Sequence, residues 1–278
     1  MATHESVLVY RGFRYLKLAS LAAVIAVIAY AVHSPLGMPN GGTWLGYTLG
    51  IVGALLILWL MYFGIRKRTY ASGTGKLEDW LSAHIYLGVA LIIIATLHTG
   101  FQFGLNIHTL AYTLMMFVII SGMYGLYAYI RFPRQMTDNQ RGVTLENLMQ
   151  QIAELSQECT DLSMTLSDEI NGIVVESGRQ TSVGGGFIRQ LSGRDPNCTT
   201  IAALARLQTI ATTLQDDHAV QARRLISRLS RKVELLYRAR KDVQLRALMK
   251  IFLFVHVPMS FALFAALFSH VFIVFFYW

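Results

Sequence analysis

The sequence contains few charged residues and only two cysteines. Asp, Glu, Lys and Arg make up 14% of its 278 residues, whereas soluble proteins carry about 25%. No charged residue occurs in the stretches 18–65, 80–130 and 251–278. Uncharged stretches of this length are typical of membrane spans and not of a soluble core. The composition therefore excludes a soluble enzyme and a disulfide-rich scaffold.

Five apolar stretches remain once Pro, Gly, Asn and charged clusters are taken as boundaries. They cover residues 15–33, 43–65, 80–103, 107–130 and 250–276. Each reaches the ~17–25 residues that a helix needs to cross a hydrocarbon layer of ~30 Å. We expect an all-α integral membrane protein with a five-helix transmembrane bundle. The first stretch is not expected to be a cleaved signal peptide, because it lacks a small-x-small site and a second span follows directly.

The predicted domains follow from these boundaries. Residues 1–130 hold transmembrane helices 1 to 4, residues 131–249 form a polar insertion, and residues 250–278 supply the helix that completes the bundle.

Basic residues predict the orientation. They cluster before the first span, after the second and after the fourth, as Arg11, Arg14, Lys17, Arg66, Lys67, Arg68, Lys76, Arg131 and Arg134. The opposite loops, 34–42 and 104–106, contain no Lys or Arg. Because positive charge marks the cytoplasmic side, we predict an inner-membrane protein with its N-terminus and residues 131–249 in the cytoplasm and its C-terminus outside. The net charge of +8 is thus an orientation signal and does not indicate nucleic-acid binding.

The cysteines do not form a cofactor motif. Cys159 and Cys198 lie in the predicted cytoplasmic stretch, where thiols normally stay reduced. There is no C-x-x-C-H motif for a c-type haem and no C-x-x-C pair for zinc or an iron–sulfur cluster. No flavin motif is present either, so this chain offers none of these redox groups.

The polar insertion has helical periodicity on both sides of a Gly- and Ser-rich centre. Apolar residues recur every three or four positions in 142–172 and again after Pro196, while 174–197 is predicted to be a connecting loop or small hairpin. We expect an antiparallel helical hairpin with coiled-coil-like periodicity, whose second arm continues into the fifth span. Residues 223–250 contain ten basic and two acidic residues. This basic end either faces lipid or docks an acidic partner.

Four histidines lie inside the spans at duplicated spacing. His84 and His98 are in the third span and His256 and His270 in the fifth, fourteen residues apart in both cases. Fourteen residues return a helix to within ~40° of the same face after ~21 Å. Both spans run in the same direction, so His84 is level with His256 and His98 with His270. One such histidine alone is equally typical of a hydrogen-bonded helix contact.

Two opposed imidazoles at each level are what a metal with trans axial ligands requires. Haem is the candidate in an apolar interior, because zinc needs four ligands per site. Ionisable residues in a membrane are rare and mark functional sites. The histidines therefore predict two metal centres, one near each face of the membrane.

The pattern His84-x13-His98 with His256-x13-His270 resembles the membrane di-haem cytochromes b, the group that includes the cytochrome b of bc complexes and the ferric-reductase-like transmembrane proteins. The resemblance implies that His84 with His256 holds an inner haem b and His98 with His270 an outer one. The chain has five spans in place of the eight of bc-type cytochrome b. It also lacks a Pro-Glu-Trp-Tyr motif and a flavin and nicotinamide domain. Because of these differences, the substrate of neither subgroup can be assigned to this chain.

Residues near the four histidines suggest how a flat haem macrocycle would fit between the helices. Glycines near the predicted ligands either leave room for it or form a helix-packing face; they are Gly46, Gly50, Gly53 and Gly88. Arg11, Arg14 and Lys250 either pair with inner haem propionates or only set the orientation. Pro258 is expected to kink the fifth helix. Carbonyls four residues before each ligand are the expected acceptors for the second imidazole N–H, namely those of Trp80, Ile94, Phe252 and Ala266.

Polar residues also gather at the predicted outer boundary. They are His33, His108, Gln102 and Asn106. Three alternatives are open: these residues line an outer quinone or partner site, the two histidines ligate a further haem, or the residues are interfacial without chemistry.

These observations favour an electron-transfer subunit that works between the quinone pool and an external redox partner, with a periplasmic multihaem cytochrome c as the first candidate. One alternative is a transmembrane reductase of ferric complexes or oxygen acting at the outer haem. The other is a haem-based membrane scaffold or redox sensor that signals through the cytoplasmic hairpin, which also leaves a homodimer open.

Overall fold

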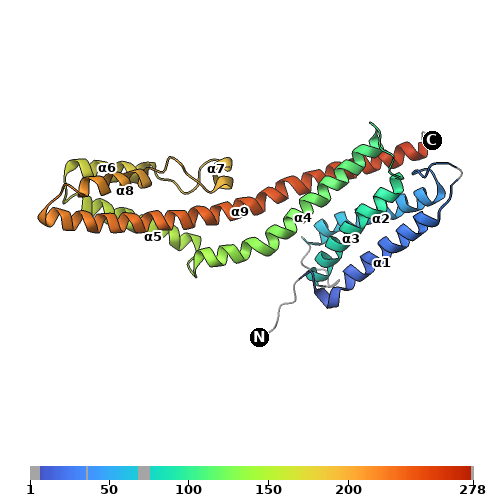
Figure 1. Cartoon of the computed structure of the whole chain (residues 1–278), viewed down its shortest axis with the longest axis horizontal. Helices are drawn as coiled ribbons and strands as arrows, with labels where there is room; N and C mark the ends of the chain where they lie inside the picture. The colour runs from blue at the N-terminus through green and yellow to red at the C-terminus, as the bar shows by residue number, and fades with distance from the viewer. Residues whose placement is uncertain (1–6, 36, 68–75, 277–278) are drawn as a thin grey trace. The chain divides into compact units, whose positions relative to one another are not determined.

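The computed structural model describes residues 7–35, 37–67 and 76–276, and these residues form helices and connecting segments without any strand. In chain order the helices are α1 (Tyr10–Val32), α2 (Trp44–Arg66), α3 (Leu77–Thr99), α4 (Ile107–Gln140), α5 (Leu145–Ser163), α6 (Asp168–Gln180), α7 (Phe187–Ser192), α8 (Thr199–Ala211) and α9 (Asp216–Phe276) (Figure 1). Five helices are long and apolar enough to cross a membrane. The predicted all-α class with five candidate spans is confirmed.

The chain divides into two compact units. Residues 1–125 and 252–278 form the first, which we call the apolar unit, and residues 126–251 form the second, the polar unit. The divisions fall inside α4 and α9. The predicted domain boundaries at 130/131 and 249/250, which concern the limits of the membrane domain, stay predictions.

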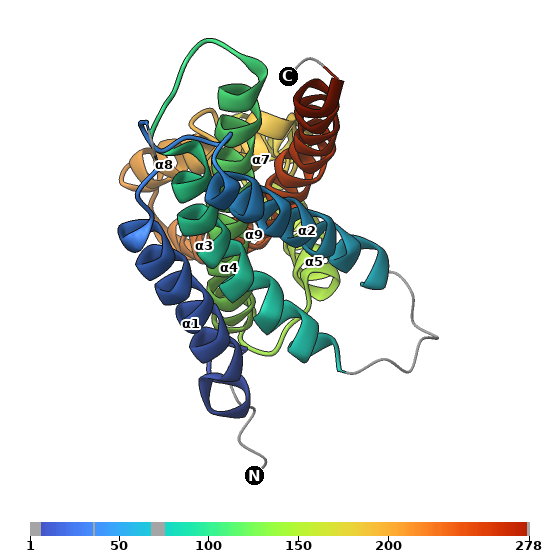
Figure 2. The same cartoon turned by 90° about the vertical axis from the view of Figure 1, so that its right-hand side faces the viewer.

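In the apolar unit, α3 packs against both α1 and α2 (Figure 2). Large apolar side chains cover the outside, including Ile25, Ile51 and Phe268, which are 58%, 60% and 67% exposed. Contiguous apolar surface of this extent is unfavourable in water. It is the surface expected of helices that face lipid, so the unit supports a multi-pass membrane protein.

Local backbone chemistry decides where α3 ends. Gly100 terminates the helix with a left-handed φ of 59°. A Cβ at this position would also collide with the carbonyl oxygen of Pro39, so glycine is required for two reasons. The third span therefore stops at Thr99, and the predicted extension to residue 103 is wrong.

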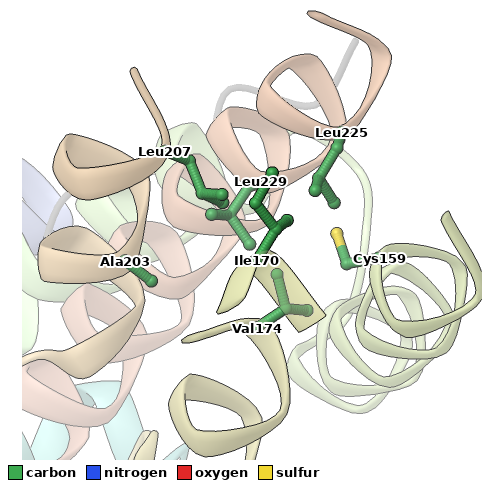
Figure 3. Close-up of a cluster of buried hydrophobic side chains, with 7 residues drawn as sticks. All are labelled: Cys159, Ile170, Val174, Ala203, Leu207, Leu225 and Leu229. Carbon is green, nitrogen blue, oxygen red and sulfur yellow. The ribbon is translucent and has the colours of Figure 1, made fainter. Parts of the chain in front are cut away.

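The polar unit encloses two apolar clusters. In the first, shown in Figure 3, Cys159 of α5, Ile170 and Val174 of α6, and Ala203 and Leu207 of α8 meet Leu225 and Leu229 of α9. The second contains Leu148, Ile152 and Leu155 of α5 with Leu235, Leu236 and Ala239 of α9. The unit thus has its own hydrophobic core.

This unit is more segmented than the predicted antiparallel hairpin. The first arm is broken between α5 and α6, where the Ser167 hydroxyl accepts a hydrogen bond from the Ile170 amide and starts a new helix. The second arm is broken between α8 and α9. The predicted connection 174–197 is also wrong in part, because α6 continues to Gln180 and α7 occupies Phe187–Ser192. Periodicity alone missed these breaks, since apolar steps continue across them.

Buried ion pairs tie the segments to α9. Arg240 donates to Asp195 at 3.0 Å, with both side chains 6% exposed, and to the carbonyl of Ser182 at 2.8 Å. Arg238 donates to the carbonyls of Asn139 and Gln140 at 3.0 and 2.7 Å. Part of the predicted basic end of α9 is therefore used inside the unit and not on its surface.

Candidate functional site

The four predicted histidines all lie half-buried in the apolar unit, two on α3 and two on α9. Leu91 stands seven residues from both His84 and His98, and Leu263 stands seven residues from both His256 and His270. These two leucines are 1% and 4% exposed and belong to one buried cluster, completed by Ile57 and Met115. Because the midpoints of both pairs pack together, the histidines form two levels at matched depths.

The first level contains three imidazoles and is called the His98 level. The rings of His98 and His270 have centroids 6.0 Å apart and planes at 79°. His108 of α4 contacts the His270 ring at 4.5 Å, and their Nδ1 atoms are 2.5 Å apart. One of these two nitrogens must donate and the other accept. If the His270 Nδ1 is the donor, the Nε2 of His270 is left without a proton in the neutral ring.

His98 is oriented by α2. Its Nδ1 donates to the carbonyl oxygen of Gly46 at 2.7 Å, which leaves Nε2 without a proton in the neutral ring. Gly50 makes the close approach possible, because a Cβ there would lie 2.7 Å from Cε1 and 2.9 Å from Nδ1 of His98. The His98 ring is thus hydrogen-bonded to the Gly46 carbonyl and packs against Gly50, which has no side chain.

The predicted glycines divide into two groups. Gly46 and Gly50 both meet His98. A Cβ on Gly53 would make an ordinary contact of 3.7 Å with Leu91, and one on Gly88 would have no neighbour within 4 Å. Only the first two glycines shape the surroundings of a histidine.

The second level, called the His84 level, contains His84 of α3 and His256 of α9. Ser121 of α4 donates its hydroxyl proton to the carbonyl of Val118 at 2.8 Å, and its oxygen lies 2.9 Å from His256 Nδ1. Since the serine has only one proton, its oxygen accepts from Nδ1, and Nε2 of His256 is the unprotonated nitrogen. Gly122 allows this contact, as its Cβ would be 3.3 Å from His256 Cε1.

His84 has a different environment. Its ring lies 4.9 Å from that of Phe63, and among the described residues its buried Nδ1 has no hydrogen-bond partner. A buried nitrogen without a partner carries an energetic cost of about 1–3 kcal/mol.

The sequence misassigned the acceptors of the histidine N–H groups. For His98 and His256 they are Gly46 on α2 and Ser121 on α4, and not the carbonyls of Ile94 and Phe252 in the same helix. Within a helix those carbonyls already accept backbone N–H groups. Ser121 and Gly122 were not predicted as site residues from the sequence. They belong to a series of small residues on the fourth span that resembles the glycine series on the second span.

Of the other predicted site residues, only His108 joins a histidine level. His33 packs edge-on against Trp44 at 5.1 Å. Gln102 donates to the carbonyl of Pro39 at 3.2 Å, and Asn106 accepts from the amide of Thr109 at 3.0 Å. The structure gives Gln102 and Asn106 backbone partners, and a shared quinone site for these residues stays a prediction.

Two of the predicted propionate ligands contact aromatic rings next to them in the chain. The guanidinium of Arg11 lies 5.4 Å from the Tyr10 ring, and that of Arg14 lies 5.7 Å from the Tyr15 ring. Arg11 also has a left-handed backbone with φ 47°, so the regular part of α1 begins after Phe13. Their role toward a haem stays a prediction.

The candidate metal ligands are pairs of histidines, with one histidine of each pair on α3 and one on α9. Over the described residues, no group of three or more His, Cys, Asp or Glu side chains is arranged to hold a metal ion. A haem would take one nitrogen from each of two imidazoles. His98 and His270, whose ring centroids are 6.0 Å apart, would supply such a pair.

Comparisons with protein-family models, with curated proteins and with solved structures gave no match to this chain. The resemblance to di-haem cytochromes b therefore rests on the histidine spacing and on the geometry of the two levels.

Proposed function

We propose that this chain is a b-type di-haem membrane cytochrome that carries electrons across the cytoplasmic membrane, between the quinone pool and an external redox partner. A periplasmic cytochrome c is the partner that this role fits best. The observation that carries the proposal is the pair of histidine levels, matched in depth around Leu91 and Leu263. The four histidines lie in the stretches 80–130 and 251–278, which contain no Asp, Glu, Lys or Arg.

Each residue has a defined part in this proposal. His84 and His256 hold the inner haem, and His98 and His270 hold the outer one. When bound, haem supplies reversible one-electron chemistry at iron. The Gly46 carbonyl and the Ser121 hydroxyl hold the proton of their histidine at Nδ1, so that Nε2 is left for the metal.

The spacing supports transfer across the membrane. The two levels are ~21 Å apart along the helix axis, which is most of a hydrocarbon layer of ~30 Å. Between them, the buried cluster around Leu91 and Leu263 excludes water. The sequence has no flavin or iron–sulfur motif, so quinone or another subunit must exchange electrons with at least one level.

The first test is the haem content of the purified full chain, measured as the pyridine haemochrome and in dithionite-reduced spectra. We expect two haems b per chain. His98→Ala and His256→Ala should each remove one, whereas His218→Ala, an exposed histidine of the polar unit, should keep both. A colourless protein from haem-replete cells would reject the proposal.

The quinone link is tested separately. Reduced quinol mixed with the haem-loaded protein should reduce the haems rapidly, and a quinone-site inhibitor should block the reaction. If no quinol reduces a protein that contains both haems, the quinone part of the proposal is wrong.

The proposed orientation places the N-terminus and residues 131–249 in the cytoplasm. It rests on the distribution of Lys and Arg between the loops. A reporter that works only outside the cytoplasm should be active when fused after Trp278. Activity of the same reporter inserted at the exposed Gly142 would contradict the orientation.

A further inference from the structure

The short helix α7 exposes two large apolar side chains on the polar unit. Phe187 is 49% exposed and Ile188 is 83% exposed. Among the large apolar side chains described in this unit, Ile188 has the highest exposed fraction. These two neighbouring side chains form a small apolar surface on a unit that has its own packed core.

Hydrogen bonds fix α7 to α9. The side-chain amide of Gln244 donates to the carbonyls of Leu191 and Ser192, at 3.0 Å each. Gly193 has a φ of 63°, and a Cβ there would lie 2.6 Å from Cδ of Gln244. The close approach therefore requires glycine, and α7 keeps a set position along α9 (Figure 1).

This position is near the start of the fifth apolar stretch. Gln244 precedes Lys250 by six residues, and Lys250 is the last charged residue of the chain. Six residues of helix rise ~9 Å. The polar layer on each side of a bilayer is roughly 5–7 Å thick, so a spanning α9 places α7 close to the lipid headgroups. Aromatic and aliphatic side chains of short amphipathic helices are favourable at that depth.

The exposed charge around α7 is positive. Arg194 and Lys241 are exposed. The acidic groups nearby are buried in ion pairs: Asp195 with Arg189 and Arg240, and Asp242 with Arg246. Each exposed basic group near an anionic surface contributes ~1 kcal/mol of attraction. This complementarity favours lipid over a protein with no acidic surface.

We propose that α7 is a lipid-binding element, in which Phe187 and Ile188 insert among anionic headgroups while Arg194 and Lys241 contact lipid phosphates. The element anchors the polar unit to the membrane surface near the first turn of the fifth span. The proposal requires that α9 spans the membrane but is independent of haem binding.

The test places a fluorescent label on α7 of the full chain in lipid nanodiscs. Ile188→Cys is labelled with an environment-sensitive dye. Met164→Cys, between α5 and α6 and 64% exposed, is the matched control. Cys159 and Cys198 are buried, so the unsubstituted chain gives the labelling background. We expect a blue-shifted emission at position 188 and several-fold stronger quenching by nitroxide lipids than at 164.

Discs of different lipid composition distinguish binding by charge from binding by apolar insertion. Quenching at 188 should be stronger in discs that contain phosphatidylglycerol than in phosphatidylcholine alone, and Arg194→Gln with Lys241→Gln should reduce the difference. Hydrogen exchange of residues 181–195 in the unsubstituted chain provides a label-free measurement and should slow in the anionic discs. Equal water accessibility of 188 and 164 in both lipids would overturn the proposal, as would protection of α7 only by an added soluble protein. Haem absorbance of the same samples reports the proposed function separately.

Discussion

The apolar and polar units are both built from helices, but their helix contacts and outer surfaces differ. The polar unit encloses large leucines such as Leu148 and Leu225, both 0% exposed. The apolar unit also buries large side chains, but its helices meet through small residues such as Ala83 and Ala90, 2% and 4% exposed, and it leaves Ile25 and Phe268 outside. In water, helices associate by burying large apolar groups. In lipid that driving force is absent, and close packing of small residues takes its place.

The buried polar groups differ in the same way. In the polar unit, Asp195 and Asp242 are buried against Arg240 and Arg246 as ion pairs, which is a structural arrangement. In the apolar unit the corresponding groups are neutral imidazoles whose Nδ1 atoms are engaged at His98 and His256. The polar unit thus pairs its buried aspartates with arginines of the same unit, whereas the apolar unit leaves imidazole nitrogens available for a ligand.

The largest expected effect is the loss of a buried ion pair in the polar unit. Arg240→Ala removes the partner of Asp195 and the donor to Ser182. It should lower the free energy of unfolding of this unit by about 3 kcal/mol, measured by hydrogen exchange of the α8 and α9 amides. Haem content should not change. Arg228→Ala is the control, because its pair with Glu158 is about half exposed and should contribute less than about 1 kcal/mol.

The next effect concerns packing at the His98 level. Gly50→Ala places a Cβ 2.7 Å from the His98 ring, which must shift at a cost of about 1–3 kcal/mol. We expect the protein to lose one of its two haems in the pyridine haemochrome assay. Gly53→Ala should retain both, because its Cβ would make an ordinary contact of 3.7 Å with Leu91. Identical haem content in the two variants would show that Gly50 does not position His98.

A single buried lysine tests the rule that the polar unit satisfies its charges. Lys232 is 3% exposed and has no ion-pair partner within the described part of the chain. Burial lowers the pKa of its ammonium from the usual 10.5. Lys232→Met should therefore stabilise the polar unit at neutral pH by roughly 1 kcal/mol or more. Lys241→Met, at an exposed position, should change stability by less than about 0.5 kcal/mol.

The pH dependence of the unfolding free energy shows the sign of the Lys232 contribution. Between the lowered pKa of Lys232 and 10.5, the unfolded chain binds more protons than the folded chain, so stability rises with pH. Burial raises the pKa of the Cys159 thiol from 9.0 to about 11, so its contribution falls as pH rises through that window. In Lys232→Met only the fall should remain, as measured by hydrogen exchange of the α5 and α9 amides. A persistent rise with pH would assign it to another group.

The smallest effect is expected from the hydrogen bond that orients His256. Ser121→Ala leaves Nδ1 of His256 without its acceptor and should cost about 1 kcal/mol. Both haems should be retained, while the midpoint potential of the one at the His84 level shifts. Ser269→Ala removes only a hydroxyl that donates within its own helix, to Ala265, and should leave both potentials unchanged.

Much of the fold was predictable because charge and apolarity are properties of each residue. The missing charges in 18–65, 80–130 and 251–278 predicted five candidate spans, and five helices of suitable length and apolarity are found. The segmentation of the polar unit was not predictable from periodicity. Its breaks depend on single capping residues such as Ser167, whose effect is local and does not interrupt the apolar repeat.

The candidate site was predictable along each helix but not between helices. The spacing of fourteen residues established which histidines share a face and how far apart they are. It could not show that His108 contacts His270, or that Ser121 and not a carbonyl of α9 faces His256. These contacts depend on the rotation of α4 against α9, and no repeat in either helix encodes that rotation.

The sequence by itself determined the class of molecule, the five candidate spans and the two pairs of histidines, because helix geometry converts residue spacing directly into face and depth. Only the tertiary structure decided which atoms surround the histidines. It placed Gly50 and the Gly46 carbonyl against His98, and it left Gly53 and Gly88 away from every imidazole. The physical reason is that packing between helices is set by side-chain shape at distances of a few ångströms, which the spacing along one chain does not contain.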